Sequence, residues 1–280
     1  MSQIRDRWVS PRLRVETVGA GAPLLVLLHG SGANGDVWAG LIPYIARGWP
    51  GRCLVPDLRG HGRSGHALPY AYGTYAADIA TVVAPEADAF LVGHSLGGAV
   101  ALTLATGWFG LRVRGVVAFG VKVDWSADEL GRRRRLASAP VRWFDRREDA
   151  IERYLKISGQ FGLVGKDSPA ALSGIVEEAG RYRLAADPAI NGGDDLPDIT
   201  AIYRAASAPV TIAVGSRDPM LSAAEAQGLA ADAVILDGLG HNVHIERPEA
   251  IWELIARASG IDSRAARLIT TNKNPGRSFE

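Results

Sequence analysis

The sequence predicts an α/β fold, with a mostly parallel central sheet flanked by helices, and three observations predict it. Short apolar runs recur between turn residues, and several are apolar throughout, which is typical of parallel strands buried on both faces. Helix-like segments separate these runs, as expected when parallel strands are joined by crossovers. The 280 residues, 47% hydrophobic and 22% charged, suffice for one large domain or a domain with an insertion.

The first part of the chain supplies five expected strands and two expected helices. An N-terminal strand is expected within "RLRVETV", ahead of the first fully apolar run, "PLLVLLHG" at 23–30. The next strands are expected at 52–57, 89–95 and 112–120, and the helices at 74–84 and 96–107. Glycine and other turn residues follow these runs, so each strand should end in a loop.

The regular alternation stops after about residue 121 and resumes near 209. Three stretches in the interval are helical in character, at 127–138, 147–158 and 169–180. Strands are then expected at 209–216 and 232–238, and helices at 221–231 and 248–258. We therefore expect a core domain of 1–121 and 209–262, a helical cap inserted over 122–208 without a second sheet, and a flexible tail over 263–280.

The overall charge and composition exclude several classes of function. With 31 Lys and Arg against 30 Asp and Glu, the net charge of +1 gives no field that would attract nucleic acid or an anionic membrane. Cys53 is the only cysteine, so no internal disulfide is possible. The polar N-terminus and the lack of a long apolar run predict a cytoplasmic protein. The run Arg132–Arg135 is interpreted as a solvated helix face, with its role left open.

Ser95 is the candidate nucleophile. The stretch "LVGHSLGG" places Gly93, Ser95 and Gly97 between an expected strand and an expected helix. In such a G-x-S-x-G turn, small flanking residues allow a strained serine whose hydroxyl is exposed at the carboxyl edge of the sheet. The following helix directs backbone N–H groups to the same place, so the Leu96 N–H is a candidate oxyanion donor.

A serine needs a histidine to remove its proton, and the chain contains six histidines. His241 follows the strand end in "LDGLGH", which brings it to the carboxyl edge where ligands of open α/β sheets bind. His244 lies three residues farther on and is expected to pack or to line a rim. Of the other histidines, His94 is expected to support the elbow, His61 and His66 to bond to backbone in their loop, and His29 to be structural.

An acid should orient that histidine and stabilise its charged form. Asp218 follows the strand expected at 209–216 and keeps the chain order Ser, Asp, His. Asp124 follows the strand at 112–120 and is the alternative acid. Asp57 also ends a strand, but it is expected to fix the loop "RGHGRS".

Five motifs in this order resemble the α/β-hydrolase fold family, and within it the cap-bearing, carboxylesterase-like serine hydrolases. They are "HGSG" (29–32), "DLRGHGRS" (57–64), "GHSLGG" (93–98), "GSRD" (215–218) and "GHNVHIERPE" (240–249). The resemblance covers about 10–260 apart from the insertion, which lies at the family's cap position. It implies an oxyanion hole of the Ser31 and Leu96 N–H groups, with Gly32 as the alternative to Ser31. Dehalogenases and epoxide hydrolases of this fold have Asp at the elbow, where this chain has Ser95.

These residues predict a serine hydrolase that cleaves a small to medium apolar ester or lactone through an acyl-enzyme, with water as second substrate. No organic cofactor is expected, and no metal, because no histidine or cysteine cluster has ligand spacing. The pocket is expected among aromatic residues of the insertion: Trp125, Trp143 and Phe144, with Tyr154, Phe161 and Tyr182. The sequence leaves open whether the protein is a monomer or a homodimer.

The same fold and residues are also compatible with other functions. A carbon-carbon bond hydrolase, a cofactor-free oxygenase or a ligand receptor could use the same fold and residues. A nucleotide-dependent oxidoreductase is a more distant alternative, because Gly30, Gly32 and Gly35 match G-x-G-x-x-G after a strand, with Asp57 at the end of the next.

Overall fold

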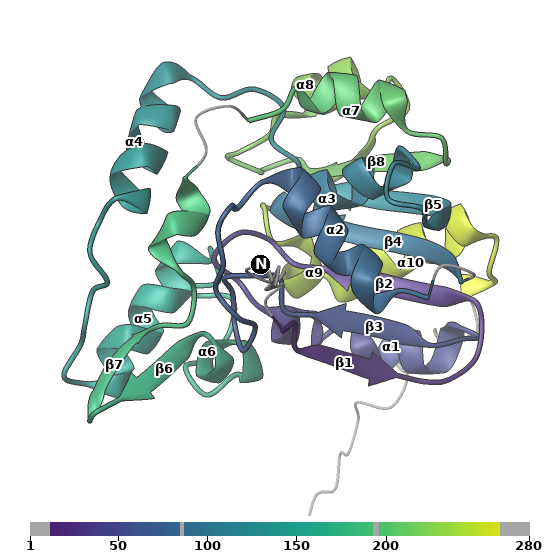
Figure 1. The fold of residues 1–280 in the computed structure, drawn as a ribbon. Helices are drawn as coiled ribbons and strands as arrows, with labels where there is room; N and C mark the ends of the chain where they lie inside the picture. Colours follow the sequence, from purple (N-terminus) through teal and green to yellow (C-terminus); the bar gives the residue numbers. More distant parts are fainter. Residues whose placement is uncertain (1–11, 85–86, 193–195, 264–280) are drawn as a thin grey trace, which may run out of the picture.

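A computed structural model describes residues 12–84, 87–192 and 196–263 of the chain. These residues form a seven-stranded sheet with the order β1-β3-β2-β4-β5-β8-β9, in which β1 is antiparallel to β3 and every other pairing is parallel (Figure 1). The strands are β1 (Val15–Val18), β2 (Leu24–Leu28), β3 (Cys53–Pro56), β4 (Asp88–His94), β5 (Arg112–Phe119), β8 (Val210–Gly215) and β9 (Val234–Leu236). The predicted fold class is confirmed.

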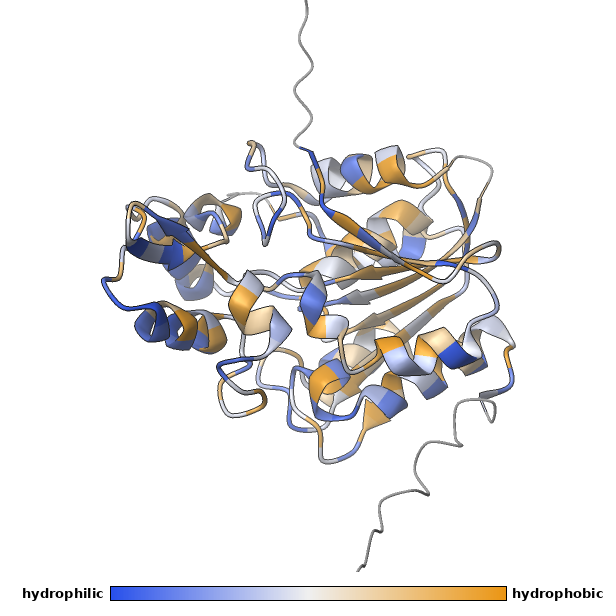
Figure 2. Cartoon of the chain, turned by 90° about the horizontal axis from the view of Figure 1, so that it is seen from below, coloured by the Kyte–Doolittle hydropathy of each residue, from blue (hydrophilic) through white to orange (hydrophobic). Residues whose placement is uncertain are grey.

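Both faces of the sheet are covered, which explains the continuous apolar runs in the sequence. In β2, Leu24, Val26 and Leu28 join one hydrophobic cluster, while Leu25 and Leu27 join another on the opposite face. The first cluster includes residues of α2 (Tyr72–Val82), α3 (Leu96–Ala105) and α8 (Ala223–Leu229). The second includes residues of η1 (Gly35–Trp38), α1 (Ile42–Gly48), α9 (Val243–Glu246) and α10 (Pro248–Ser259). Figure 2 shows the apolar strands enclosed between these helical layers.

The segment between β5 and β8 stands largely to one side of the sheet in Figure 1. It contains α4 (Ala127–Ala137), α5 (Arg147–Ile157), α6 (Pro169–Ser173), β6 (Ile175–Glu178), β7 (Arg181–Leu184), η2 (Pro188–Asn191) and α7 (Ile199–Ala205). We call residues 122–208 the inserted segment. Its last helix, α7, packs against the core, because Ile199 and Ile202 belong to the same cluster as α3.

The expectation that the inserted segment has no second sheet is wrong. The stretch 169–180 was expected to be one helix, but α6 ends at Ser173, and β6 pairs with β7 as an antiparallel hairpin. Ala179 and Gly180 connect the two strands with φ of 50° and 75°, the positive values that a two-residue hairpin turn requires. The β-branched pair Ile175 and Val176 also favours a strand over a helix.

Two expectations about the ends of the chain are not decided by this structure. The C-terminal tail expected over 263–280 lies outside the described residues, except for residue 263. The polar N-terminus, residues 1–11, also lies outside them. Within the described part of the chain, none of the helices combines the length and apolarity needed to cross a bilayer.

Candidate active site

Ser95 occupies a sharp turn between β4 and α3. Its backbone φ is 52°, a value that costs energy for a residue with a side chain and that exposes the hydroxyl above the strand end. The turn is possible because Gly93 and Gly97 lack side chains. A Cβ on Gly93 would lie 2.2 Å from the Gly97 carbonyl oxygen, and one on Gly97 would lie 2.1 Å from the Leu28 carbonyl oxygen. The Ser95 N–H donates to the Phe119 carbonyl of β5 at 2.9 Å, which ties the turn to the sheet.

His241 and Asp218 form a hydrogen-bonded pair at the same edge of the sheet. The His241 Nδ1–H donates to Asp218 Oδ2 at 2.8 Å, while Asp218 Oδ1 accepts the Met220 backbone N–H at 2.7 Å. The Asp218 side chain is only 1% exposed, so both of its oxygens have protein partners in a buried position. This bond keeps the proton of neutral His241 on Nδ1, and Nε2 is left free to accept one.

Asp218 rather than Asp124 has the position expected of the orienting acid. Asp124 is exposed, and within the described residues it makes no hydrogen bond or ion pair with His241. Gly120, which follows β5, has a φ of 61°, and a Cβ there would lie 3.1 Å from His241 Cε1 and 3.4 Å from Asp218 Oδ2. The glycine therefore leaves room for the pair, a role that the sequence alone does not indicate.

Ser95 and His241 line one cavity, and His94 holds the two segments together. The His94 Nε2–H donates to the His241 carbonyl oxygen at 3.0 Å, and the centroids of the two rings are 4.6 Å apart. Since His94 directly precedes Ser95, this bond fixes the His241 loop against the elbow. His94 is 4% exposed, and burial lowers its pKa well below the usual value for histidine.

His244 is a packing residue, as predicted. It is 1% exposed, with its ring centroid 4.7 Å from that of Trp38 and 5.6 Å from that of Phe119. Burial lowers its pKa to about 3, so the ring is neutral at physiological pH. Its Nδ1 is buried without a partner among the described residues.

The remaining histidines all bond to backbone, as predicted for His61 and His66, and His29 has the structural role expected of it. The His29 Nδ1–H donates to the Gly30 carbonyl at 2.8 Å, and its Nε2 accepts the Leu58 N–H at 2.9 Å. The His61 Nδ1–H donates to the Arg59 carbonyl at 2.8 Å, and the His66 Nε2–H to the Ala185 carbonyl at 3.0 Å. Burial lowers the pKa of His29 and lowers that of His61 to about 3.

The loop after β2 offers backbone donors beside Ser95. The Ala33 N–H donates to the Gly30 carbonyl at 3.2 Å, and Gly32 has a φ of 74°, the geometry of a type II turn with Ser31 and Gly32 at its centre. Within the described part of the chain, the N–H groups of Ser31, Gly32 and Leu96 have no protein acceptor. Ser31 and Gly32 both stay candidates for the donor opposite Leu96.

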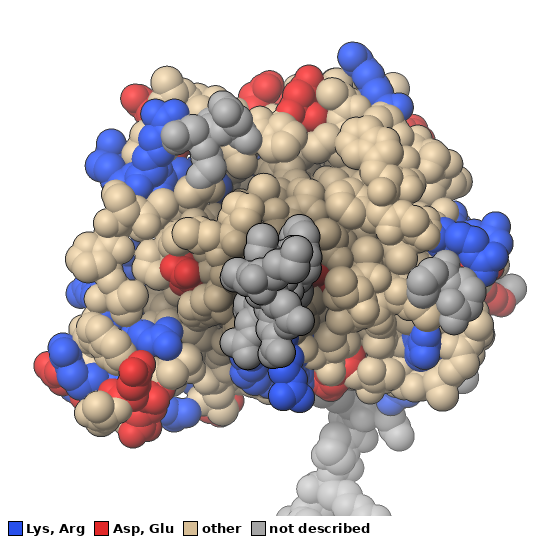
Figure 3. All heavy atoms as spheres, viewed as in Figure 1, with Lys and Arg blue, Asp and Glu red and all other residues tan. Residues whose placement is uncertain are grey.

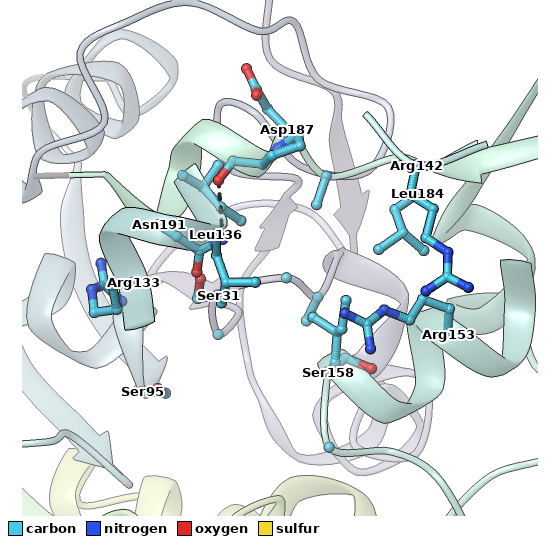
Figure 4. Close-up of a pocket in the computed structure, with 18 of the residues that line it drawn as sticks. Ser31, Ser95, Arg133, Leu136, Arg142, Arg153, Ser158, Leu184, Asp187 and Asn191 are labelled. Carbon is cyan, nitrogen blue, oxygen red and sulfur yellow. Dashed lines mark hydrogen bonds between the residues drawn. The ribbon is translucent and has the colours of Figure 1, made fainter. Parts of the chain in front are cut away.

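The cavity has a volume of about 1050 Å³ and lies between the sheet edge and the inserted segment (Figure 4). Its wall includes Trp125, Trp143 and Phe144, the aromatic residues favoured by the sequence. Three other aromatic residues lie elsewhere. Tyr154 is buried within the inserted segment, Phe161 is 54% exposed, and Tyr182 is bridged to Phe144 through the backbone.

Hydrogen bonds join the inserted segment to the two loops of the site. In the loop after β2, Asn34 Nδ2 donates to Tyr154 Oη at 3.0 Å and to the Ala170 carbonyl at 2.9 Å. In the loop after His241, Asn242 Nδ2 donates to the Gly159 carbonyl at 2.9 Å. No local pattern predicts these contacts, because the partners are far apart in the chain.

The contacts of Asp57 speak against a nucleotide site. Its Oδ2 accepts the Arg63 N–H at 2.9 Å and so holds the loop "RGHGRS", as predicted. Its Oδ1 accepts the Gly35 N–H at 2.7 Å, a second contact that was not predicted. It is therefore not free to bind a ribose, and Gly35 begins only the short η1. Among the described residues there is no cluster of three or more His, Cys, Asp or Glu side chains that could hold a metal ion.

Comparisons with known proteins agree with the class of protein that this fold and site define. The chain belongs to the alpha/beta hydrolase family, whose model matches residues 25–254. It is similar to the pimeloyl-[acyl-carrier protein] methyl ester esterase of Edwardsiella ictaluri, with 41% identity over 101 residues, 36% of this chain and 37% of that protein. The esterase of the same name from Methylococcus capsulatus is 28% identical over 217 residues, 75% of this chain and 81% of that protein.

A solved structure extends the likeness over most of the chain. E-2-(acetamidomethylene)succinate hydrolase superposes with a TM-score of 0.74 at 25% identity, covering 89% of this chain and 96% of that one. The chain spans only about a third of the length of the first curated relatives that it matches.

Proposed function

We propose that this protein is a serine hydrolase that cleaves a carboxylic ester or lactone through an acyl-enzyme. The observation that carries the proposal is the His241 to Asp218 hydrogen bond at 2.8 Å, at the rim of the cavity that Ser95 also lines. This bond leaves His241 Nε2 as a base directed away from the acid. The similarity to two methyl ester esterases supports ester hydrolysis as the type of reaction.

Each residue has a definite role in the proposed acylation. Ser95 Oγ attacks the carbonyl carbon while His241 Nε2 takes the hydroxyl proton, and Asp218 stabilises the imidazolium that forms. The tetrahedral oxyanion accepts one hydrogen bond from the Leu96 N–H, at the N-terminus of α3, and another from the Ser31 or Gly32 N–H, in the loop after β2. The intermediate then collapses, and the alcohol leaves with the proton held by His241.

Water completes the cycle. A water molecule takes the place of the alcohol beside His241. His241 removes a proton from this water while the water oxygen attacks the acyl carbonyl carbon. The second tetrahedral intermediate uses the same oxyanion donors, and its collapse returns the proton to Ser95 Oγ and releases the acid. No step needs a metal or an organic cofactor.

The inserted segment is proposed to act as the cap of this site. It contributes most of the cavity wall, and the contacts of Asn34 and Asn242 hold it against both catalytic loops. We further propose that the protein acts in the cytoplasm on a small-molecule ester or lactone, as a monomer or homodimer, without nucleic acid or membrane as partner. The net charge of +1 supports this choice of partner.

Hydrolysis of p-nitrophenyl butyrate tests the proposal. We expect turnover by the unmodified protein and a fall in kcat/KM of roughly 10³-fold or more in Ser95→Ala and in His241→Ala. His244→Leu is the matched control: it replaces a nearby, packed imidazole and should retain activity. Full activity of Ser95→Ala would overturn the proposal. So would an unmodified protein that hydrolyses neither this ester nor a simple lactone. Ester turnover also separates it from a carbon-carbon bond hydrolase, a cofactor-free oxygenase and a ligand receptor.

A further inference from the structure

The cavity wall is rich in positive charge. Of the described residues that line it, four are arginines of the inserted segment: Arg133, Arg142, Arg153 and Arg183. Two carboxylates, Asp187 and Glu246, also line it, and both are bound by protein groups. Asp187 accepts hydrogen bonds from Tyr70 Oη at 2.7 Å and from the Ala189 N–H at 2.9 Å, and Glu246 accepts one from the Gly240 N–H at 2.9 Å. Among the described residues, neither carboxylate forms an ion pair with any of the four arginines, which outnumber them in the wall.

Arg133 is the member of the Arg132–Arg135 run that turns inward. Arg132, Arg134 and Arg135 are exposed, and basic side chains gather over α4 in the upper left of Figure 3. Arg133 is half-buried and lines the cavity together with Leu136, one helical turn farther on. The charged run therefore divides into a solvated face and one arginine that faces the site.

In the part of the chain that the structure describes, the Arg133 guanidinium is held in place without an anionic partner. Its Cζ lies 4.7 Å from the centroid of the Trp125 ring, a cation-π contact that fixes the side chain in the wall. Its Nε is buried and has no hydrogen-bond partner, and no carboxylate of the described residues forms an ion pair with it. Burial lowers the pKa of Arg133 below its ordinary value.

An unpaired, partly desolvated cation is costly to a folded protein. A bound anion would offset that cost by supplying the missing hydrogen-bond acceptor. Figure 4 shows Arg133 on the same side of the cavity as Ser95, with Arg142 and Arg153 on the other side. Within the described residues neither of those two has an ion-pair partner, whereas Arg183 lies 3.6 Å from Glu178.

We propose that the natural substrate is an ester with a second, anionic group, a carboxylate or a phosphate, and that Arg133 binds this group while Ser95 attacks the ester carbonyl. The inference rests on the proposed serine hydrolase function, and it replaces the apolar substrate expected from the aromatic residues. Arg142 and Arg153 keep the opposite wall positive and so favour anions over neutral esters throughout the cavity.

Two esters of equal chain length test the inference: the mono-p-nitrophenyl ester of adipic acid, which ends in a carboxylate, and p-nitrophenyl hexanoate, which ends in a methyl group. We expect the unmodified protein to have the higher kcat/KM with the adipate ester. In Arg133→Gln the ratio of the two kcat/KM values should fall roughly 10- to 100-fold, the effect of one hydrogen bond to a charged group. Arg132→Gln, which removes an exposed charge from the same run, is the matched control and should keep the ratio.

Inhibition of hexanoate ester hydrolysis by adipate and by inorganic phosphate identifies the anion. Inhibition that is lost in Arg133→Gln is due to an anion bound at Arg133. If adipate inhibits in this way more strongly than phosphate, the natural group is a carboxylate; if phosphate inhibits more strongly, it is a phosphate. An adipate-to-hexanoate ratio near one, together with no inhibition by either anion, would overturn the inference while leaving the serine hydrolase in place. An equal fall of the ratio in Arg132→Gln would also overturn it. A failure of both esters to turn over would instead contradict the proposed function.

Discussion

Replacing Asp218 by Asn should stop the reaction by reversing the tautomer of His241. Asp218 accepts one hydrogen bond on each oxygen, from the Met220 N–H at 2.7 Å and from the His241 Nδ1–H at 2.8 Å. Asparagine has only one oxygen. If its NH₂ group faced the Met220 N–H, two buried donors would oppose each other, at a cost of about 1–3 kcal/mol. The amide oxygen should therefore stay with Met220.

The NH₂ group would then face His241 Nδ1, which must accept its proton. The ring proton moves to Nε2, the nitrogen that should take the proton of Ser95. We expect kcat/KM for p-nitrophenyl butyrate to fall roughly 10⁴-fold in Asp218→Asn, or about 5 kcal/mol of transition-state stabilisation, the loss typical of this change in serine triads.

Asp124→Asn is the matched control, because Asp124 follows the neighbouring strand and is exposed. It should keep the activity of the unmodified protein, and thermal unfolding should show that both variants are folded. Asp218 does not orient His241 if Asp218→Asn keeps more than about a tenth of the kcat/KM of the unmodified protein, or if Asp124→Asn loses more kcat/KM than Asp218→Asn.

Two further predictions concern stability and the room around the His241 ring. Burial lowers the pKa of His61 and of His244 to about 3, so the unfolded chain takes up their protons below about pH 6.5 and the folded protein does not. Between pH 7.5 and pH 5.5, the free energy of unfolding should fall by about 1.4 kcal/mol for each of these two histidines. In denaturant titrations at the two pH values, His244→Leu should show a decrease about 1.4 kcal/mol smaller than that of the unmodified protein. An equal decrease in the two proteins would refute the prediction. Gly120→Ala should reduce ester turnover, because the added Cβ would lie 3.1 Å from His241 Cε1. Gly110→Ala is the control: Gly110 also has a positive φ, but its Cβ would have no atom within 4 Å, so this change should lower stability without reducing turnover. Equal ester turnover by the two variants would refute the prediction.

The features that the sequence predicted are those that local chemistry determines. The elbow could be recognised because Gly93 and Gly97 must lack side chains for Ser95 to take its positive φ. Asp218 and His241 could be located because each follows a strand that ends at the same sheet edge. Such loops converge whenever the strands are parallel, so spacing and chain order were enough to indicate the pair.

The features that the sequence did not predict depend on contacts between distant residues. Arg133 is one of four consecutive arginines, and only the packing of α4 beside Trp125 distinguishes it from its neighbours. Tyr154 was expected in the pocket wall, but its hydroxyl accepts the hydrogen bond from Asn34, which draws it into the interior. The hairpin of β6 and β7 is not predicted, because the short turn at Ala179 and Gly180 falls within a stretch of helical character, 169–180.

Covalent labelling shows directly whether Ser95 is a nucleophile activated by His241. The unmodified protein would be treated with a fluorophosphonate, and the adduct would be located by peptide mass spectrometry, with His241→Ala and His244→Leu treated in parallel. We predict rapid modification at Ser95, strongly slowed in His241→Ala and retained in His244→Leu, because the hydroxyl is nucleophilic only beside its base. No adduct on Ser95 in the unmodified protein would show that Ser95 is not an activated nucleophile, and equal labelling rates with and without His241 would show that His241 is not its base.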